Sequence, residues 1–503
     1  MRYDSFWRRI CRAFMTAPPP DARAHAACCA GDVDGARPID HGRAAFETDS
    51  EGPKVLIGPR VLILTSGLGC GHTRAAQALR LALVEREPSC TVRTVDWWSL
   101  MNVHVAETTK RIYLQLVTEH SDLYEQIYHL DQHTWRELLS AQHSVPQSVV
   151  RFFELLRTAR LGGRLHSIRE TFASDLALAS LFCASGGEGK RFLASGMFAK
   201  LALFKWSWAR LVRRLGAVVD EFRPDVVVST QMIPAALFSS VKQQCRLDIP
   251  SIAVVTDFGI HDFWNQAGTD LYCLGHASIT EMPVGFDTSR IAVTGLPLMP
   301  GFANPTETRN ARRHLGLCEH GAVVLVLGGG LGIDVDAVAA RLSRARADVQ
   351  LLVLRGRAGA SNDAIDKAGL DARVRVFDWT ERVDIFIRAA DIVVGKCGGL
   401  TVAEVLACGR PLLATRSLRG QEGFNVRFMQ RHCVGGWLTD DALLDSLDSL
   451  LQRPDELMTL KERVWRLGQR DGAQRIANRV LSFAGRTQAQ RFEVAAWRSS
   501  RNQ

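Results

Sequence analysis

The chain has 503 residues, of which 47% are hydrophobic, and a formal net charge of +9. This length exceeds what one compact core organises, and the composition excludes a disordered chain, so we expect two α/β domains with additional segments. The twelve cysteines form no CxxC pair and no Cys/His cluster of zinc-finger spacing. That argues against a disulfide scaffold or a structural metal site and favours a reducing compartment.

Residues 1–53 predict a mobile leader. They contain APPP at positions 17–20, many Ala, Gly and Asp residues, and no sustained periodicity. The first fifteen residues lack the unbroken apolar run of a signal peptide, and no later stretch reaches the roughly 18 uncharged apolar residues of a membrane span. We therefore expect a protein without a signal peptide or transmembrane helix that stays in the cytoplasm unless it binds a surface, which would place it peripherally at the cytoplasmic face of a membrane.

The segment that follows predicts an N-terminal Rossmann-like domain over residues 54–300. VLILTS after Arg60 reads as a strand, GLGCG as a glycine-rich turn and HTRAAQALRLALVERE as a helix, which together open a βαβ unit. A helical insertion is expected at about 105–222. β-Branched runs typical of a buried parallel sheet lie at 91–97, 224–230, 249–257, 270–275 and 290–295.

The insertion carries most of the excess positive charge. Residues 151–215 contain twelve Lys or Arg against four Asp or Glu, interleaved with Phe, Leu and Trp. A basic helix with large apolar residues suits an anionic lipid surface. The same pattern also fits two ordinary amphipathic helices whose apolar side is core. Nucleic acid could use the charge, but no RNA- or DNA-binding motif accompanies it, so no nucleic-acid partner is expected.

A second series of strands predicts a C-terminal domain over residues 301–470. The segment GLPLMPGFANP (295–305) is interpreted as the interdomain linker. Residues 471–503 are expected to form a C-terminal helix and tail, for which a return to the N-terminal domain is one option. Strand runs alternate with helical patterns, as in doubly wound parallel sheets; they lie at 322–330, 349–356, 373–379, 391–396 and 410–415. Two such domains facing across a cleft form the GT-B architecture, although dehydrogenases and epimerases also use two Rossmann-like domains.

The first glycine-rich turn, Gly67 to His72, stands between a strand and a helix. Such a turn directs backbone N–H groups and the positive helix end toward an anion. His72 occupies the place of the third glycine in a GxGxxG fingerprint, which weakens a dinucleotide interpretation. A histidine at a helix start in a cleft can act as a general base. The alternative is a histidine that only caps or packs.

The second glycine-rich turn, KCGGLTVAE at 396–404, also joins a strand to a helix. Paired glycines let a phosphate approach the backbone, Thr401 adds a hydroxyl, and Glu404 is placed to accept both hydroxyls of a ribose. The alternative for Glu404 alone is a first-turn acid that complements the helix dipole. The GQEGFN run at 420–425 supplies the mixed donors and acceptors that sugar hydroxyls require.

These motifs together resemble one glycosyltransferase family. The run from GKCGGLTVAEVLACGRPLL to GQEGFN is similar to the donor-site signature of the family that contains monogalactosyldiacylglycerol synthase, processive diacylglycerol glucosyltransferases and the peptidoglycan lipid-linked N-acetylglucosaminyltransferase. SGLGCGHTRAAQAL resembles that family's glycine-rich loop ending in His, and VTDFGIHDFW resembles its VTD, His and Trp stretch, which points to the diacylglycerol branch. The resemblance covers most of residues 60–435 outside the insertion.

The resemblance implies a site between the domains. It makes His72 and Asp257 the catalytic residues, with His72 as the base, and it places Gly69, Gly71, His261 and Trp264 on the acceptor side. Glu404 would hold the ribose, and the remaining donor-site residues would be Gly398, Gly399, Thr401, Gln421, Glu422, Asn425, Gly329, Lys396 and Phe377. Cys70 and Cys397 replace residues that the family commonly has before its glycines, and FDW at 377–379 departs from the family's uracil-contacting pattern.

The expected reaction is therefore an inverting transfer of a hexose from a UDP-sugar to a membrane lipid, with diacylglycerol as the first choice of acceptor. UDP-sugar is a substrate in this scheme, and neither a cofactor nor a metal ion is required, because the donor loop has no Asp-x-Asp cluster. Two alternatives stay open: a soluble UDP-sugar enzyme such as an epimerase, and a non-catalytic nucleotide- or lipid-binding relative. The sequence does not choose among galactose, glucose and N-acetylglucosamine.

Overall fold

The computed structural model describes residues 58–67, 69–101, 103, 106–107, 110, 197–331, 335–345, 348–356, 373–416, 422–438 and 440–501. The predicted leader lies outside these residues. So does most of the predicted insertion, of which the described part is mainly helix α9 (Met197–Phe222). The membrane-binding interpretation of residues 151–196 is therefore not addressed by the described structure. Among the described residues, no helix combines the length and the apolar character needed to cross a bilayer.

The N-terminal domain is a parallel sheet covered on both faces. Its strands lie in the order β2-β1-β3-β4-β5-β6, with bounds β1 Arg60–Thr65, β2 Thr91–Asp96, β3 Val226–Ser229, β4 Ser251–Val254, β5 Leu271–Leu274 and β6 Ile291–Val293. One face packs against α3 (Cys70–Arg86), and the other packs against α9 and α10 (Met232–Cys245). The central strands are buried on both faces, which explains their unbroken β-branched composition.

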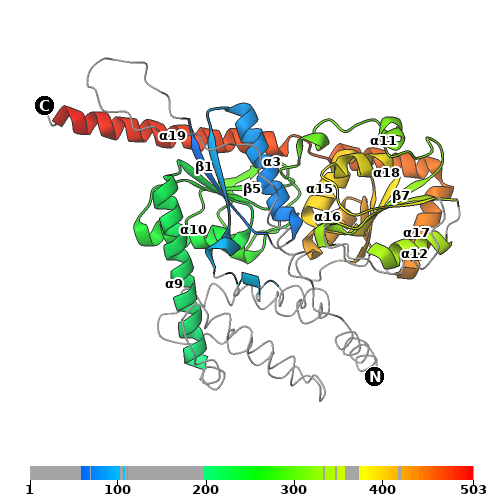
Figure 1. Cartoon of the computed structure of the whole chain (residues 1–503), viewed down its shortest axis with the longest axis horizontal. Helices are drawn as coiled ribbons and strands as arrows, with labels where there is room; N and C mark the ends of the chain where they lie inside the picture. The colour runs from blue at the N-terminus through cyan, green and yellow to red at the C-terminus, as the bar shows by residue number, and fades with distance from the viewer. Residues whose placement is uncertain are drawn as a thin grey trace.

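The last helix of the chain belongs to the N-terminal domain core. Helix α19 (Gly472–Arg501) follows the whole C-terminal domain in sequence, yet it lies along α3 (Figure 1). Ile476, Val480 and Ala484 are fully buried in the same cluster as the β1 residues Val61 and Ile63. The chain therefore crosses between the domains twice.

The C-terminal domain holds a second six-stranded parallel sheet, in the order β12-β11-β10-β7-β8-β9. If these strands are numbered from one to six within the domain, their order is 6-5-4-1-2-3, which is the 3-2-1-4-5-6 order of dinucleotide-binding folds seen from the opposite edge. The strands are β7 Val323–Leu327, β8 Gln350–Leu354, β9 Val374–Phe377, β10 Ile392–Lys396, β11 Leu412–Arg416 and β12 Gly435–Trp437. The first five match predicted strand runs. β12 was not predicted, because three residues with two glycines give no periodic signal.

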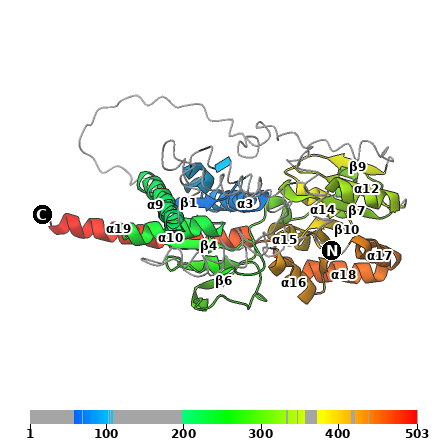
Figure 2. The same ribbon diagram turned by 90° about the horizontal axis from the view of Figure 1, so that it is seen from below.

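Helices cover both faces of this second sheet, and the two domains lie side by side (Figure 2). The fold-class prediction is confirmed: two doubly wound α/β domains form the GT-B architecture. The described helices of the C-terminal domain are α11 Thr308–His314, α12 Val335–Ala345, α14 Val383–Ala389, α15 Gly399–Cys408, α16 Gly423–Arg431, α17 Asp440–Gln452 and α18 Pro454–Leu467.

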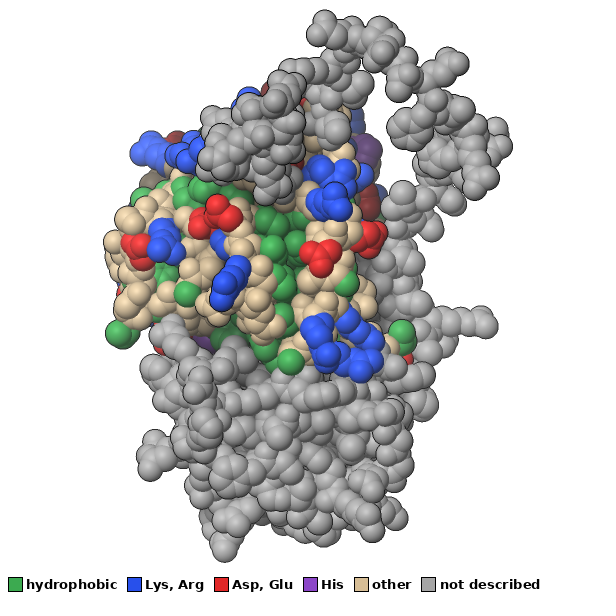
Figure 3. All heavy atoms as spheres, turned by 90° about the vertical axis from the view of Figure 1, so that its left-hand side faces the viewer, with side chains coloured by type: hydrophobic (Ala, Val, Ile, Leu, Met, Phe, Trp, Pro, Cys, Tyr) green, Lys and Arg blue, Asp and Glu red, His purple; other side chains and the backbone are tan. Residues whose placement is uncertain are grey.

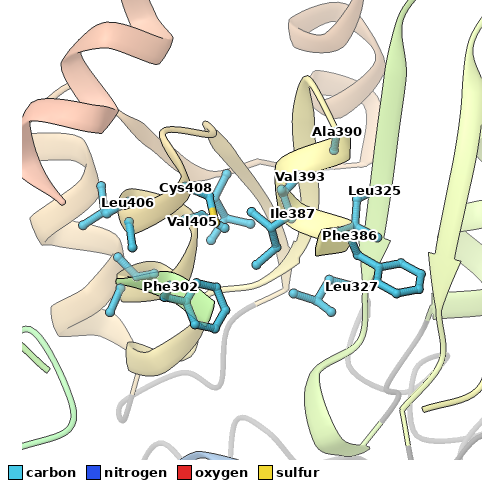
Figure 4. Packing of buried hydrophobic residues seen from close by; sticks show 14 of the residues in the cluster. Phe302, Leu325, Leu327, Phe386, Ile387, Ala390, Val393, Val405, Leu406 and Cys408 are labelled. Atoms are coloured by element: carbon cyan, nitrogen blue, oxygen red, sulfur yellow. The ribbon is translucent and has the colours of Figure 1, made fainter. Parts of the chain in front are cut away.

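The segment predicted as a linker connects the domains but is not a loose connection. Leu296, Leu298 and Phe302 are 2%, 4% and 1% exposed and belong to the main core cluster of the C-terminal domain. Figure 4 shows the Phe302 ring among Val405, Leu406 and other side chains of that cluster. Burial of these side chains fixes the first crossing between the domains, so the prolines and glycines here shape a packed segment.

Candidate active site

His72 stands where the ends of three N-terminal strands meet. It is the third residue of α3, directly after the β1 turn, and its Nδ1 lies 2.9 Å from the carbonyl oxygen of Thr230 and 3.1 Å from the hydroxyl of Thr256. Because a carbonyl oxygen only accepts hydrogen bonds, Nδ1 of the neutral ring carries the proton. The lone pair then lies on Nε2, so the ring is a proton acceptor at that atom.

The surroundings of His72 keep it uncharged at neutral pH. Burial lowers its pKa to about 4, the Thr230 carbonyl opposes this shift, and the positive charge of Lys396 adds to it. A neutral imidazole can take a proton, but a pKa of about 4 makes it a weak base. An anionic diphosphate beside Lys396 offsets the charge of the lysine and thereby raises the pKa of His72. An anion bound beside Lys396 would therefore make His72 a stronger base.

The start of α15 faces His72 from the C-terminal domain and is in direct contact with the N-terminal domain. A Cβ added at Gly399 would lie 2.0 Å from the Thr256 carbonyl oxygen and 2.8 Å from Asp257 Oδ1, so only glycine permits this approach. Gly398 precedes the helix as its N-cap, without a side-chain cap. The first backbone N–H groups of α15 thus point toward the interface, where an anion is favoured.

The side chain of Asp257 occupies this helix start in the structure. Its carboxylate accepts hydrogen bonds from the backbone N–H of Gly399 and from Asn425 Nδ2, the latter at 3.0 Å. Burial raises the pKa of Asp257, while the Asn425 and Gly399 hydrogen bonds and the charge of Lys396 oppose the rise. Asp257, predicted as a catalytic residue, therefore belongs to the contact between the domains as well as to the N-terminal loop that carries it.

Asn425 joins the two domains through its side-chain amide. Its Oδ1 accepts from the backbone N–H of Phe258 at 2.8 Å, and its Nδ2 donates to Asp257 and to the carbonyl oxygen of Cys397. The residue is fully buried. The prediction that Asn425 reads the donor sugar stays a prediction, because in this structure its hydrogen bonds are made with protein groups.

Lys396 and Glu422 form an ion pair at the end of β10. Lys396 Nζ lies 2.6 Å from Glu422 Oε1, and the side chains are 23% and 4% exposed. The lysine also acts on the titration of both His72 and Asp257. One cation thus influences the base, the interface acid and the predicted sugar-reading carboxylate, so these four groups form one electrostatic unit.

Glu404 lies one turn into α15, where the sequence placed a ribose-binding carboxylate. Burial raises its pKa to about 7, Arg74 of α3 lowers it, and Asp384 of α14 raises it. Thr401 lies in the first turn of the same helix and is partly exposed. A half-buried carboxylate at this height of the helix is able to accept hydrogen bonds from ligand hydroxyls when it is ionised.

Three predicted donor residues remain: Gly329, Phe377 and Gln421. Gly329 begins a short turn after β7 with a φ of +62°, and a Cβ on the next residue, Gly330, would lie 2.1 Å from Cys70 Sγ in α3. This turn therefore lies against the N-terminal loop. The Phe377 ring packs edge-on against Phe386 at 4.8 Å and adjoins the domain core. Gln421 lies outside the described residues.

The predicted acceptor residues divide into two groups. Gly69 and Gly71 flank the start of α3, beside His72. His261 and Trp264 are 4% and 5% exposed; His261 Nδ1 accepts from the backbone N–H of Phe263, and Trp264 packs in the N-terminal core. Contact of His261 and Trp264 with an acceptor stays a prediction, whereas their contacts here support the loop that follows Asp257.

Sequence reasoning missed three residues of this site: Thr230, Thr256 and Arg74. The two threonines follow β3 and β4, at the carboxyl ends of parallel strands, where ligands bind in open α/β sheets. Their position at the ends of predicted strands could therefore have identified both threonines from the sequence. Arg74 gave no such signal, because its contact partner is distant in sequence. Among the described residues no group of three or more His, Cys, Asp or Glu is placed to hold a metal ion, and the expectation that no cofactor is needed stays untested.

The two-domain architecture and the paired glycine-rich turns are the arrangement expected of a glycosyltransferase. Comparison with known proteins agrees: residues 191–298 match the family model described as monogalactosyldiacylglycerol (MGDG) synthase, and residues 323–423 match the glycosyltransferase family 28 C-terminal domain. The chain is therefore an enzyme of the glycosyltransferase class, related to the MGDG synthases and to the diacylglycerol glycosyltransferases of the same family. The resemblance seen in the sequence is confirmed.

Individual relatives match about half of this chain. The chain is 26% identical over 259 residues to the processive diacylglycerol beta-glucosyltransferase of Bacillus subtilis, covering 50% of this chain and 67% of the relative. The Bacillus cereus enzyme of the same name is 25% identical over 281 residues, covering 54% and 71%. The crystal structure of Acinetobacter baumannii MurG aligns over 84% of this chain and 99% of its own, with 13% identity and a TM-score of 0.49.

Proposed function

We propose that this protein transfers a hexose from a UDP-sugar to a hydroxyl group of a membrane lipid, with diacylglycerol as the acceptor and inversion at the anomeric carbon. The observation that carries the proposal is the placement of a neutral histidine, with Nδ1 held by Thr230, across the domain interface from the start of α15. A proton acceptor and an anion-binding helix start on opposite domains are the two groups that such a transfer needs.

The proposed reaction uses these groups in order. His72 Nε2 takes the proton of the lipid hydroxyl while that oxygen forms a bond to the anomeric carbon, and the bond from this carbon to the nucleoside diphosphate breaks. The negative charge that develops on the leaving diphosphate is stabilised by the N–H groups at the start of α15 and by Lys396. Because the diphosphate and Asp257 both suit the same helix start, donor binding shifts the hydrogen bonds of Asp257.

The choice of a lipid acceptor rests on the relatives and on the surface. The two Bacillus relatives are diacylglycerol glucosyltransferases by name. On the side of the molecule where α19 ends, a strip of apolar surface is bordered by Lys and Arg side chains, with Asp and Glu side chains among them (Figure 3). The apolar strip suits contact with a lipid surface, and the basic side chains suit anionic headgroups. We therefore place the enzyme peripherally on the cytoplasmic face of a membrane.

The test offers UDP-glucose, UDP-galactose and UDP-N-acetylglucosamine separately to the full chain with vesicles that contain diacylglycerol and an anionic lipid. We expect one donor to give a hexosyl-diacylglycerol, identified by mass, and the enzyme to float with the vesicles. Conversion of one UDP-sugar into another without a lipid product would instead identify an epimerase. Nucleotide or vesicle binding without any turnover would identify a non-catalytic relative.

A further inference from the structure

Arg74 of the N-terminal domain reaches the C-terminal domain. It lies two residues after His72 on α3, and its Nη2 donates to the carbonyl oxygen of Glu381 at 2.8 Å. Its Nη1 donates to Gln77 Oε1 one turn further along the helix, at 3.3 Å. The guanidinium is therefore held from both domains, and α3 and α15 are in contact beside it.

The place that Arg74 reaches is the predicted nucleoside end of the donor site. Glu381 closes the loop that follows β9, where the family resemblance expects the uracil, and Glu404 is the residue expected at the ribose. The positive charge of Arg74 lowers the pKa of Glu404. One N-terminal side chain thus lies beside both of the C-terminal segments that would contact the nucleoside.

The charges around Glu404 make Arg74 its favourable neighbour. On α14, the Asp384 carboxylate opposes ionisation of Glu404 and is itself paired with Arg382 at 2.9 Å and 3.0 Å. On α15 itself, Cys408 is the titratable neighbour, with a pKa that burial raises to about 12, so it stays neutral. Among the groups that act on Glu404 in the described structure, Arg74 is the one that favours the carboxylate.

We propose that Arg74 is a positioning residue for the nucleoside diphosphate: it comes from the N-terminal domain, completes the donor site beside Glu404, and makes nucleotide affinity depend on contact between the domains. This inference rests on the proposed function. An ionised Glu404 accepts hydrogen bonds from both ribose hydroxyls, whereas a protonated one donates with one oxygen and loses part of that capacity. Without Arg74, a larger share of Glu404 is protonated at neutral pH.

The test measures UDP binding to the full chain by titration calorimetry between pH 6 and pH 9. Arg74→Gln is expected to weaken binding about tenfold at pH 6–7, the equivalent of one pKa unit on Glu404, and by less than about twofold at pH 9, where Glu404 is ionised in either case. Arg74→Lys, which keeps the charge, should recover most of the affinity at neutral pH. Arg80→Gln, an exposed position on the same helix, is the matched control and should bind like wild type.

A second variant separates this role from a structural one. In a Glu404→Gln background, Arg74→Gln should cause little further loss, because there is no carboxylate left to keep charged. The same loss at every pH, or an undiminished loss in the Glu404→Gln background, would overturn the inference. If Glu404→Gln weakens UDP binding while Arg74→Gln does not, this inference alone is wrong. If the wild-type chain binds no uridine nucleotide, the proposed function is wrong and the inference falls with it.

Discussion

The two halves of the site are built in different ways. On the N-terminal side, His72 is fixed within one domain by Thr230 and Thr256, so its tautomer and position do not depend on the partner domain. On the C-terminal side, the start of α15 is in contact with the N-terminal domain through Gly399, and Asn425 crosses the interface. The base is set in advance, whereas the donor half is completed by the contact between domains.

Because the two halves are built differently, mutations in them should have different effects. Changes at the base should remove chemistry and spare nucleotide binding, while changes at the interface should alter donor binding and stability together. Each of the following variants tests one side of that division.

The largest effect is expected for His72→Ala. Loss of the general base should lower the rate of sugar transfer by about 10²–10⁴-fold, while UDP affinity changes by no more than about twofold. Transfer rates and calorimetric binding of UDP measure the two quantities. His314→Ala, at an exposed histidine of α11, is the matched control. Undiminished transfer by the His72 variant would remove the base from the account.

Gly399→Ala should affect both binding and stability. The added methyl group meets the Thr256 carbonyl, so the helix start must withdraw from the N-terminal domain at a cost of about 3 kcal/mol. Donor affinity and the melting temperature should fall together. Gly485→Ala on α19, where an added Cβ meets nothing within 4 Å, should leave both unchanged or raise stability slightly. A Gly399 variant with normal donor affinity would show that the contact between domains is not needed.

Asn425→Ala should be somewhat milder. It leaves the Phe258 N–H and the Cys397 carbonyl oxygen without their side-chain partner and releases Asp257. We expect a loss of about 2 kcal/mol in unfolding free energy, read by denaturant titration. Asn310→Ala, an exposed asparagine on α11, serves as the control. Stability equal to wild type would mean that the buried amide does not hold the domains together.

The smallest effect is expected in the pH dependence of stability, through a pair of histidines at the domain interface. His276 and His432 lie on opposite domains with Ser278 between them, whose hydroxyl is 2.8 Å from a ring nitrogen of each. Burial lowers the pKa of both histidines. The separated state therefore binds more protons below about pH 6.5, and the contact weakens as the pH falls through that range. Between pH 7 and pH 5, His432→Gln should reduce the pH-dependent fall in melting temperature by about 2–4 °C.

Thermal unfolding scans at pH 7 and pH 5 measure these melting temperatures. The wild-type chain and the His432→Gln variant are compared with His320→Gln, which changes an exposed histidine. An equal fall in melting temperature between pH 7 and pH 5 in all three proteins would show that protonation of the histidine pair does not weaken the contact between the domains.

Much of the fold followed from the sequence, because unbroken β-branched runs and glycine turns have local causes. The five strand runs of the C-terminal domain were predictable in this way. β12 was not, since a three-residue strand with two glycines gives no periodic signal. The buried character of 295–305 also escaped, because prolines and glycines suggest a loop whatever surrounds them, and the packing of Phe302 depends on the other domain elements.

The site residues that lie in recognisable sequence motifs could be predicted. His72, Gly399 and Glu404 follow from loops at strand ends. The partners of these residues did not follow: the hydrogen bond from Asn425 to Asp257 and the reach of Arg74 to Glu381 join residues that are more than 160 positions apart. Such contacts are set by how two finished domains meet, which no local pattern encodes.

The anomeric configuration of the lipid product tests the proposed inverting transfer directly. UDP-hexoses carry the sugar in an α linkage, so a single displacement assisted by His72 must give a β-glycoside. Proton NMR of the purified hexosyl-diacylglycerol reports this through the coupling of the anomeric proton. We expect the β-anomer from the wild-type enzyme and almost no product from His72→Ala. An α-linked product would contradict the single inverting displacement at this interface.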